Sequence, residues 1–446
     1  MLRRWMLGLA ALVVLVCLGG CKSLALDVEA QLVPPRSTGE QEKIQQALEK
    51  YVQEQFGAKS AASYVLKYPK TGDYRSAFIL QDLDGDGVEE AIAFYRVGEE
   101  NKARIHLLRK SAGEWTFVGD MEGAGANVDR VLFGDLDGNG GREIIVGWDA
   151  FNNRDRQMIL YTLSGGQLTA RSVDIYTDIV VGDITNSGRD DILTLRIYGT
   201  EKVTAQLWSM QDGALSEKAS VLLDGYIQRF AGARIGKMSP GVNGVYIDCY
   251  KDARTMITEL IYWDGANLNA PLYKIAEQQT GRESGIPSMD VDGDGEVEWP
   301  VSKRLPGYTD SSADQSQWLT SWMSWDHAAR SPREEFLSVV NVEDGYYVMV
   351  DDSWADDFTV NYDRASRTLD FQVVDTGNIG GVFFSIRATA LTAPSTEPSD
   401  PSKYGRSYRL LTDDNHTRYD VWYREDDVFQ LNMDRIRYIV AFCSFK

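Results

Sequence analysis

Short runs of β-branched and aromatic residues alternate with turns rich in Gly and Asp through the middle of the chain. One stretch is representative: residues 128–133 precede an Asp/Gly loop, residues 143–148 follow it, and residues 157–162 and 168–173 come next. Runs of this length and composition predict β-strands, and the residues between them predict tight turns. The pattern therefore predicts groups of four strands joined by short connections.

A nine-residue loop recurs five times along this part of the chain. Its copies begin at residues 82, 135, 183, 237 and 290, so that successive copies start 53, 48, 54 and 53 residues apart. A second turn follows 28 to 31 residues after the start of each of the first four copies, at Gly113, Gly166, Gly213 and Gly265. Two turns in register within each period predict one four-stranded sheet per repeat.

These loops and their flanking strands resemble FG-GAP/VCBS-type repeats, the calcium-bearing blades of integrin-α-like propellers. The resemblance implies a β-propeller over residues 75–342, in which each loop joins the first and second strands of its blade. The expected fold class is mainly β, with about five four-stranded blades, or up to seven if the flanks contribute. Residues 343–446 are expected to form a C-terminal α+β domain, in which residues 408–411 pair with 418–423, residues 392–402 form an insertion and residues 427–442 form a helix. The alternative is a sixth and seventh blade of degenerate sequence.

The chemistry of the loops points to a hard cation. Oxygen-bearing side chains at positions one, three and five can turn inward, glycine at position six permits the curl, and positions seven and nine add a carbonyl and a carboxylate. Ligand sets made only of oxygen favour Ca²⁺ over transition metals, so about three calcium sites are predicted. Their ligands are Asp82, Asp84, Asp86, the Val88 carbonyl and Glu90; Asp135, Asp137, Asn139, the Gly141 carbonyl and Glu143; and Asp290, Asp292, Asp294, the Glu296 carbonyl and Glu298.

The other two copies are weaker candidates for a metal site. The third keeps Asp183 and Asp191 but has Thr185 and Ser187 between them, and the fourth begins with Lys237 where the first carboxylate belongs. An EF-hand is excluded, because it needs flanking helices and a bidentate glutamate at position twelve. The remaining alternative is a set of solvated Asp/Gly turns without metal. Bound calcium is expected to be structural rather than catalytic.

The N-terminus predicts export. Arg3 and Arg4 precede an apolar stretch, residues 5–18, that is too short to span a bilayer comfortably. The Leu-Gly-Gly-Cys box that ends this stretch resembles the lipobox of bacterial lipoproteins. The resemblance implies a signal peptide over residues 1–20, cleavage before Cys21, lipidation of Cys21, and anchoring to the outer face of the cytoplasmic membrane or to an outer membrane. The alternatives are a plain signal peptide with a chance cysteine and an uncleaved anchor.

Two short segments are expected between the signal peptide and the first repeat. Residues 21–38 would form a tether. Residues 39–74 would form a helix over 39–56, capped by Thr38, and then a strand at 63–68, which could close the ring. The two cysteines that remain in the mature chain, Cys249 and Cys443, lie among apolar residues and are expected to be buried free thiols. A disulfide between them is the alternative.

Charge narrows the possible partners. The chain has 46 Lys and Arg against 66 Asp and Glu, a formal net charge of −20. Such a surface repels phosphate backbones, and no Lys/Arg-rich run is present, so no nucleic-acid partner is expected. The membrane, through the N-terminal lipid, and an unidentified protein or glycan are the expected partners.

No set of residues with an evident catalytic arrangement emerges. His106 lies inside a predicted strand, and the sequence contains no Gly-x-Ser-x-Gly elbow, phosphate loop or His/Cys metal spacing. Trp318, Trp322 and Trp325 could stack on sugars, but packing inside the fifth blade is the favoured interpretation. The sequence therefore favours a non-catalytic, lipid-anchored cell-surface protein that binds a protein or glycan or supports envelope assembly. The alternative is a propeller-based extracellular lyase or hydrolase.

Overall fold

The structure is a computed structural model. It describes residues 39–57, 59, 63–98, 100–149, 156–239, 241–309, 316–390, 407–413, 417–424, 429–443 and 445. The predicted signal peptide and tether, with Cys21 and the Thr38 cap, lie outside the described residues, as does the predicted insertion at 392–402. None of the described helices combines the length and apolar character needed to cross a membrane.

Most described residues form antiparallel sheets, each built largely from consecutive strands. The first sheet contains β1 (Val65–Leu66), β2 (Phe78–Gln81), β3 (Glu90–Arg96), β4 (Arg104–Ser111) and β5 (Glu114–Glu122). The second contains β6 (Val128–Gly134), β7 (Glu143–Trp148), β8 (Arg156–Ser164) and β9 (Gln167–Tyr176). The third contains β10 (Asp178–Gly182), β11 (Asp191–Tyr198), β12 (Lys202–Gln211) and β13 (Ala214–Leu223). The fourth contains β14 (Arg229–Ser239), β15 (Val242–Tyr250), β16 (Met256–Trp263) and β17 (Leu268–Asn269).

The last two sheets occupy the C-terminal part of the chain. The fifth contains β18 (Trp299–Arg304), β19 (Trp318–Asp326), β20 (Ser331–Asn341), β21 (Tyr346–Val350) and the last strand of the chain, β27 (Val440–Phe442). The sixth contains β22 (Phe358–Asp363), β23 (Thr368–Asp375), β24 (Asn378–Ala390), β25 (Ser407–Asp413) and β26 (Thr417–Tyr423). The helices are α3 (Glu40–Phe56), α5 (Ala276–Thr280), the short 3-10 helix η2 (Asp352–Trp354) and α7 (Met433–Ile439).

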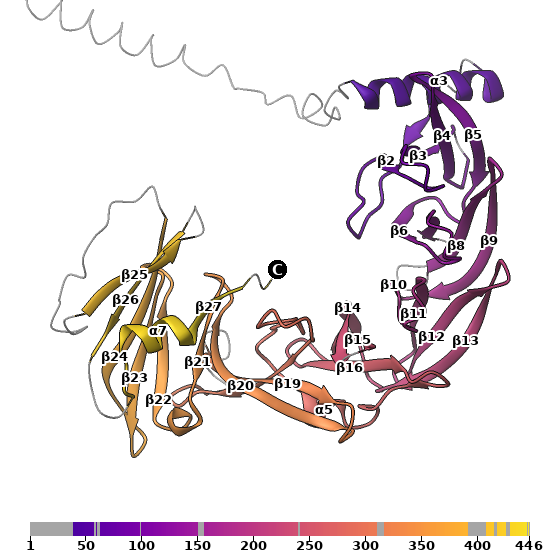
Figure 1. Cartoon of the computed structure of the whole chain (residues 1–446). Coiled ribbons are helices and arrows are strands. Elements are labelled where there is room, and N and C mark those ends of the chain that lie inside the picture. Colours follow the sequence, from indigo (N-terminus) through magenta and orange to yellow (C-terminus); the bar gives the residue numbers. More distant parts are fainter. Residues whose placement is uncertain are drawn as a thin grey trace, which may run out of the picture.

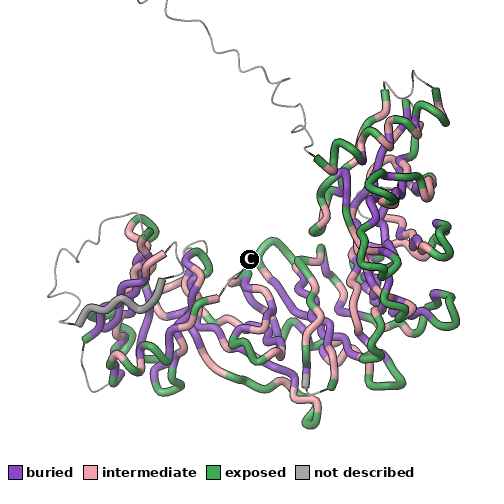
Figure 2. Tube along the Cα trace, turned by 45° about the horizontal axis from the view of Figure 1, so that its top comes forward, coloured by how far each residue is buried: buried purple, intermediate pink, exposed green. Residues whose placement is uncertain are grey.

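The mainly β fold and its groups of four strands agree with the sequence pattern. Strand β7 is buried along its whole length, whereas β12 alternates buried and more exposed positions for most of its length. A strand covered on both faces is expected to be apolar at consecutive positions, because neighbouring sheets pack against both of its faces. The apolar clusters accordingly join residues of successive sheets, such as Ile92 with Val131 and Ile145 with Ile192. Figure 2 shows buried residues along the strands and exposed ones at the turns.

The second turn of each of the first three periods is a tight hairpin, as its glycines predict, whereas the turn at Gly265 is longer and joins Trp263 to Leu268. Ala112 and Gly113 both have positive φ, and the turns at Gly166 and Gly213 have two consecutive residues with positive φ as well. Such turns match the right-handed twist of the flanking strands, and they favour glycine because its backbone reaches positive φ without steric cost. The glycine spacing therefore located the connections between the third and fourth strands.

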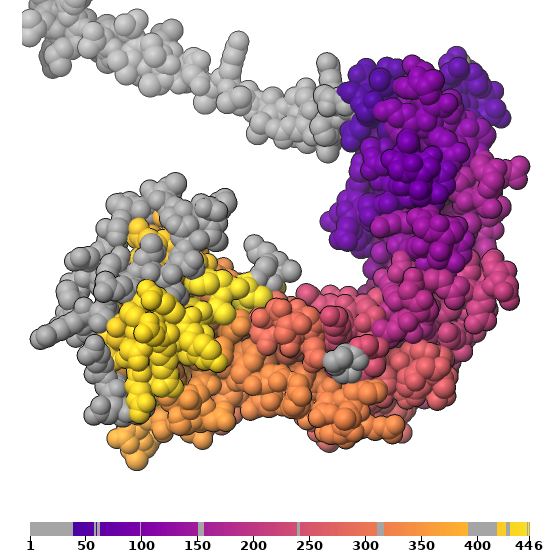
Figure 3. Space-filling view, viewed as in Figure 1, coloured from indigo at the N-terminus to yellow at the C-terminus, as the bar shows by residue number. Residues whose placement is uncertain are grey.

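The sheets follow one another along an open arc, with β5, β9 and β13 on its outer side (Figures 1 and 3). This differs from the closed ring that a propeller implies. Two pairings account for the difference among the described residues. Strand β1 pairs with β3 of its own sheet, and the C-terminal strand β27 pairs with β21 of the fifth sheet. Neither end of the chain thus supplies a strand to the opposite end, and the predicted closing role of residues 63–68 is wrong.

The boundary expected at residue 343 is also corrected. Strand β21 pairs with β20 over five residues, so it extends the fifth sheet instead of starting a separate domain. The sixth sheet begins at Phe358, and its first three strands form a meander, while β26 lies between β24 and β25. The predicted pairing of residues 408–411 with 418–423 is confirmed. The predicted helix at 427–442 is shorter, because its last residues form β27.

Helix α3 begins and ends close to the predicted positions. Ile44, Leu48 and Val52 form its buried stripe and pack on the first sheet against Ala91 and Trp115. The spacing of these three residues is that of one helix face. Cys249 and Cys443 are both free thiols; Cys249 is fully buried, whereas Cys443 is only partly buried, contrary to the expectation for it.

Candidate metal centres

The first aspartate of each intact loop holds the loop in its curled shape. In the first loop, Asp82 Oδ1 accepts the amide of Gly85 at 2.9 Å and Oδ2 accepts the amide of Gly87 at 3.0 Å. Both glycines have positive φ. The same pair of bonds recurs from Gly138 and Gly140 to Asp135, and from Gly293 and Gly295 to Asp290. The repeated Asp and Gly positions thus have a shared structural cause.

Two of the loops gather three carboxylates each. One oxygen from each of Asp82, Asp84 and Asp86 lies within 4.8 Å of the others. The same holds for the cluster of Asp290, Asp292 and Asp294. Calcium binds oxygen at about 2.3–2.6 Å, so oxygens on opposite sides of one ion lie about 5 Å apart. The residues predicted at positions one, three and five of these two loops therefore fit a shared cation.

The second loop is less complete. It brings Asp135 and Asp137 together with Asn139, whose side-chain amide donates to Asp137 Oδ2 at 2.9 Å. The Asn139 Oδ1 accepts the amide of Gly141 at 2.6 Å. With only two carboxylates and an amide already bonded within the loop, this site carries less negative charge than the other two.

The glutamates at position nine lie against their own loops but outside the three-carboxylate clusters. Glu90, Glu143 and Glu298 are buried and belong to neither three-carboxylate cluster among the described residues. Each accepts the amide of the second loop residue, for example Leu83 at 3.0 Å from Glu90 Oε2. The bonds from Leu136 to Glu143 and from Val291 to Glu298 are equivalent. These carboxylates therefore hold the loop in place through one oxygen each, and their role as direct ligands stays a prediction.

Burial changes the proton affinity of these glutamates. It raises the pKa of Glu143 to about 7 and that of Glu298 to about 8, and the loop aspartates nearby act in the same direction. Burial also raises the pKa of Glu90, although its bond from Arg109 opposes the shift. A cation bound above the glutamates would favour their charged forms.

The third and fourth loops bring no acidic cluster together. In the third, Asp183 accepts the amides of Ser187 and Gly188, and Asp191 accepts both the amide and the hydroxyl of Thr185. The fourth is a tight hairpin in which Ser239 pairs with Val242. Both loops are poor metal sites because they lack carboxylates at positions three and five, and the fourth loop also lacks one at position one, as the sequence indicated.

Successive loops are joined by hydrogen bonds between sheets. Each loop donates to a backbone carbonyl near the start of the loop before it. The bonds run from Arg142 N to Leu83 O (3.0 Å), Asp190 N to Asp135 O (2.9 Å), Asn243 Nδ2 to Asp183 O (2.7 Å) and Val297 N to Lys237 O (3.1 Å). The five loops thus form one continuous row, including the two that lack an acidic cluster.

Arg109, which lies outside the sequence motif, bonds to two carboxylates of the first loop. Arg109 of β4 donates from Nη2 to Asp84 and from Nε to Glu90 Oε1 at 3.0 Å. Its guanidinium thereby supplies positive charge beside the carboxylates. The only signal in the sequence is the place of Arg109 on the third strand, nineteen residues beyond Glu90.

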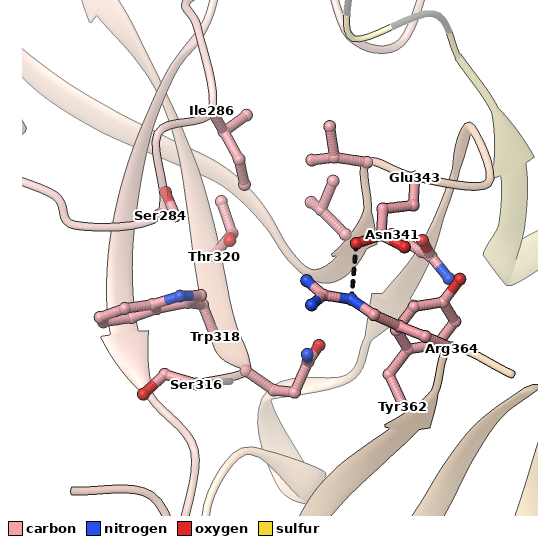
Figure 4. Close-up of a pocket in the computed structure, with 12 residues that line it drawn as sticks. Ser284, Ile286, Ser316, Trp318, Thr320, Asn341, Glu343, Tyr362 and Arg364 are labelled. Carbon is pink, nitrogen blue, oxygen red and sulfur yellow. Dashed lines mark hydrogen bonds and ion pairs between the residues drawn. The ribbon is translucent and has the colours of Figure 1, made fainter. Parts of the chain in front are cut away.

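His106 and two of the three clustered tryptophans have buried side chains. His106 is fully buried in β4, and its Nδ1 lies 3.0 Å from Asp120 Oδ2. Trp322 and Trp325 are buried, so their packing role is confirmed. Trp318 is only partly buried and lines a hollow of about 180 Å³ between the fifth and sixth sheets. Figure 4 shows Arg364 and Tyr362 on the side opposite Trp318.

No family model and no curated protein matches this chain. Three solved structures illustrate the similarities found at the level of fold. They are the exotype rhamnogalacturonan lyase YesX (11% identity, TM-score 0.27, 69% of this chain and 71% of that chain), the rhamnogalacturonan lyase PL11 of Bacillus licheniformis (12%, 0.30, 71% and 72%), and a protein from Lactobacillus plantarum (8%, 0.29, 70% and 84%). Likeness at this level supports no statement about activity or ligand.

Proposed function

We propose that this chain is a non-catalytic binding module of the bacterial cell surface, stabilised by calcium in its repeat loops and anchored by a lipid on Cys21. Its propeller-like series of sheets would present a surface to a protein or glycan partner. The observation that carries the calcium part is the pair of clusters Asp82, Asp84, Asp86 and Asp290, Asp292, Asp294.

The stabilising role of calcium rests on the charge of these clusters. Three carboxylates within 4.8 Å repel one another when no cation is present. An ion that binds the folded loop but not the unfolded chain adds RT ln(1 + [Ca²⁺]/Kd) to the free energy of unfolding. Since the loops are linked in one row, each ion would stabilise the contact between neighbouring sheets as well as its own loop.

Calorimetry and thermal unfolding of the full chain test this proposal. Titration should find calcium binding at the first and fifth loops, and the melting temperature should rise by a few degrees between chelator and millimolar calcium. Identical melting curves in the two conditions would contradict a structural role. Polysaccharide and peptide hydrolysis assays separate the binding module from the alternative lyase or hydrolase, because only an enzyme would turn over substrate.

The anchor is tested separately. Cys21→Ala should release the protein from the membrane fraction or leave the signal segment uncleaved, because the sulfur that would carry the lipid is missing. Unchanged membrane retention together with normal processing would contradict the anchor and leave the calcium proposal intact.

A further inference from the structure

A hollow of about 1000 Å³ lies between the third and fourth sheets, away from the repeat loops. Its walls come from the β11–β12 turn, the β15–β16 turn, and the two connections that follow β13 and β17. Strand β11 runs from the third loop to this hollow over eight residues, a distance of about 25 Å. The hollow is therefore remote from the metal centres, and its volume is within the range of pockets that take small ligands.

An exposed aromatic ring and several charged groups line the hollow. Tyr226 is 59% exposed, although it sits at the mouth of a pocket and its hydroxyl lies 3.4 Å from Glu201 Oε1. The Nζ of Lys251 lies 5.9 Å from the centroid of the Tyr226 ring, over one face, and the ring is otherwise largely exposed. An aromatic face beside hydrogen-bonding groups suits a sugar ring, whose C–H face packs on the aromatic ring while its hydroxyls bond to the polar side chains.

The charges of the hollow leave two lysines for a ligand. Lys251 is already paired with Glu277 at 3.2 Å, and its Nζ lies 3.9 Å from Asp224. Lys202 and Lys274 also line the hollow, and neither has a carboxylate within 4.0 Å among the described residues. The Nζ of Lys202 lies 5.1 Å from the ring centroid of Tyr198, and that of Lys274 lies 5.1 Å from the ring centroid of Tyr273, contacts that leave the charge of both lysines in place. The two lysines would favour a ligand that carries carboxylates.

The backbone at the hollow is held in an uncommon conformation. Tyr226 and Lys274 have φ of 63° and 68°, in the left-handed region that residues other than glycine seldom adopt. Strain of this kind costs free energy and persists where the surroundings enforce it, often at binding sites. Both residues thus present their side chains at the hollow from a backbone conformation that their surroundings hold in place.

Buried carboxylates enforce this conformation. The amide of Lys274 donates to Asp224 Oδ1 at 2.6 Å, and the amide of Asp224 donates to Glu259 Oε1 at 2.6 Å. Glu259 is fully buried in β16. On the other side, the amide of Tyr226 donates to Thr200 O at 2.7 Å. The core of the fourth sheet thus positions the groups that line the hollow.

We infer that this hollow binds an acidic oligosaccharide, with a uronate ring stacked on Tyr226 and its carboxylate facing Lys202 or Lys274. The inference rests on the proposed function as a binding module and names the chemical class of its ligand. Glu201 would accept hydrogen bonds from the hydroxyls of the sugar.

Calorimetry of the full chain with tetragalacturonate, and with its neutral methyl ester as the control ligand, tests the inference. The acid should bind saturably and less tightly at high salt, and the ester should bind at least about fivefold more weakly, since screening and loss of charge both remove the lysine contacts. Lys274→Asn should weaken binding about two- to fivefold and Tyr226→Asn about tenfold. Asparagine is chosen because it tolerates positive φ.

The matched control is Arg330→Asn. Arg330 is an exposed cation with φ of 54°, in the β19–β20 turn and outside the hollow. This variant should bind the acid like the wild type. The inference is overturned if the wild type does not bind at millimolar ligand, if the ester binds equally well, or if Tyr226→Asn has no effect. Calcium titration of the same variants should be unchanged, so failure of the calcium proposal would be seen separately.

Discussion

The first and fifth loops have nearly the same sequence and the same internal hydrogen bonds, but their surroundings carry different charge. Leu108 pairs with Ala91 and Met323 pairs with Trp299, so Arg109 and Ser324 occupy equivalent positions beside the glutamate at position nine. Arg109 bridges Asp84 and Glu90 in the first loop.

In the fifth loop the equivalent residue brings no positive charge. The Ser324 hydroxyl donates to Glu335, whose carboxylate is itself paired with Arg333 at 2.6 Å. Burial raises the pKa of Asp292, and the neighbouring aspartates and Glu335 act in the same direction. The guanidinium of Arg109 bonds directly to loop carboxylates and competes with a metal ion for their oxygens. Arg333 bonds instead to Glu335, which lies outside the fifth loop, so the loop oxygens stay available to an ion. Two loops of one motif are therefore expected to bind calcium with different affinities, the fifth more tightly than the first.

The largest expected effect comes from removing a carboxylate of the fifth cluster. Asp292→Ala should weaken the tighter calcium site at least about tenfold, because affinity follows the number of charged ligands. The melting temperature in millimolar calcium should fall by a few degrees, which corresponds to about 1–2 kcal/mol of lost binding free energy.

Two further variants complete this experiment. Asp84→Ala should cost less calcium-dependent stability than Asp292→Ala, because its site is weaker from the outset. Ser239→Ala, in the loop without acidic residues, should leave calcium binding unchanged. An equal loss for Asp84→Ala and Asp292→Ala would remove the predicted difference between the loops.

Exchange of the equivalent residues tests the cause of the difference. Arg109→Ser should raise the affinity of the first loop for calcium about two- to fivefold, and Ser324→Arg should lower that of the fifth by a similar factor, the range expected for partly exposed ion pairs. Calorimetry measures both. In chelator, Arg109→Ser should lower the melting temperature, because buried Glu90 loses its partner. Unchanged affinity in both variants would place the cause elsewhere.

A separate effect should appear in the pH dependence of stability without calcium. Burial raises the pKa of Glu298 from 4.5 to about 8, so the folded state binds a proton that the unfolded state releases. The free energy of unfolding should therefore fall as pH rises from about 5 to about 8. Glu298→Gln should reduce this fall and raise the melting temperature at pH 8 in chelator. The control, Glu90→Gln, should lower it, since Arg109 loses one of its two carboxylate partners and keeps only Asp84. A melting temperature that shifts in the same direction in both variants would contradict the proposed difference in charge between the first and fifth loops.

Much of the fold could be predicted from the sequence, because its signals are local. The curl of each loop depends on amides three and five residues beyond its first aspartate, which donate to that carboxylate, as Gly85 and Gly87 donate to Asp82. Each hairpin depends on a glycine at the turn. Interactions over so few residues form wherever their residues occur in order. The same reasoning correctly assigned the strands around the loops, helix α3 and the loops that lack acidic clusters.

The C-terminal boundary and the open arc could not be predicted in this way. Strand β21 has the apolar composition of any strand, and only its pairing with β20 assigns it to the fifth sheet. Strand β27 pairs with β21 across about ninety intervening residues. Such pairings depend on which strand edges are free once the sheets have assembled, and composition carries no record of that.

The sequence by itself determined the five loops, their period and the carboxylates at positions one, three and five, since these follow from bonds within nine residues. Only the tertiary structure decided that the position-nine glutamates lie beneath the loops, that Arg109 reaches the first loop, and that Tyr226 and Lys274 meet at one hollow. The physical reason is that burial and charge at a site depend on side chains brought together by sheet pairing, some of them nearly fifty residues apart in the chain.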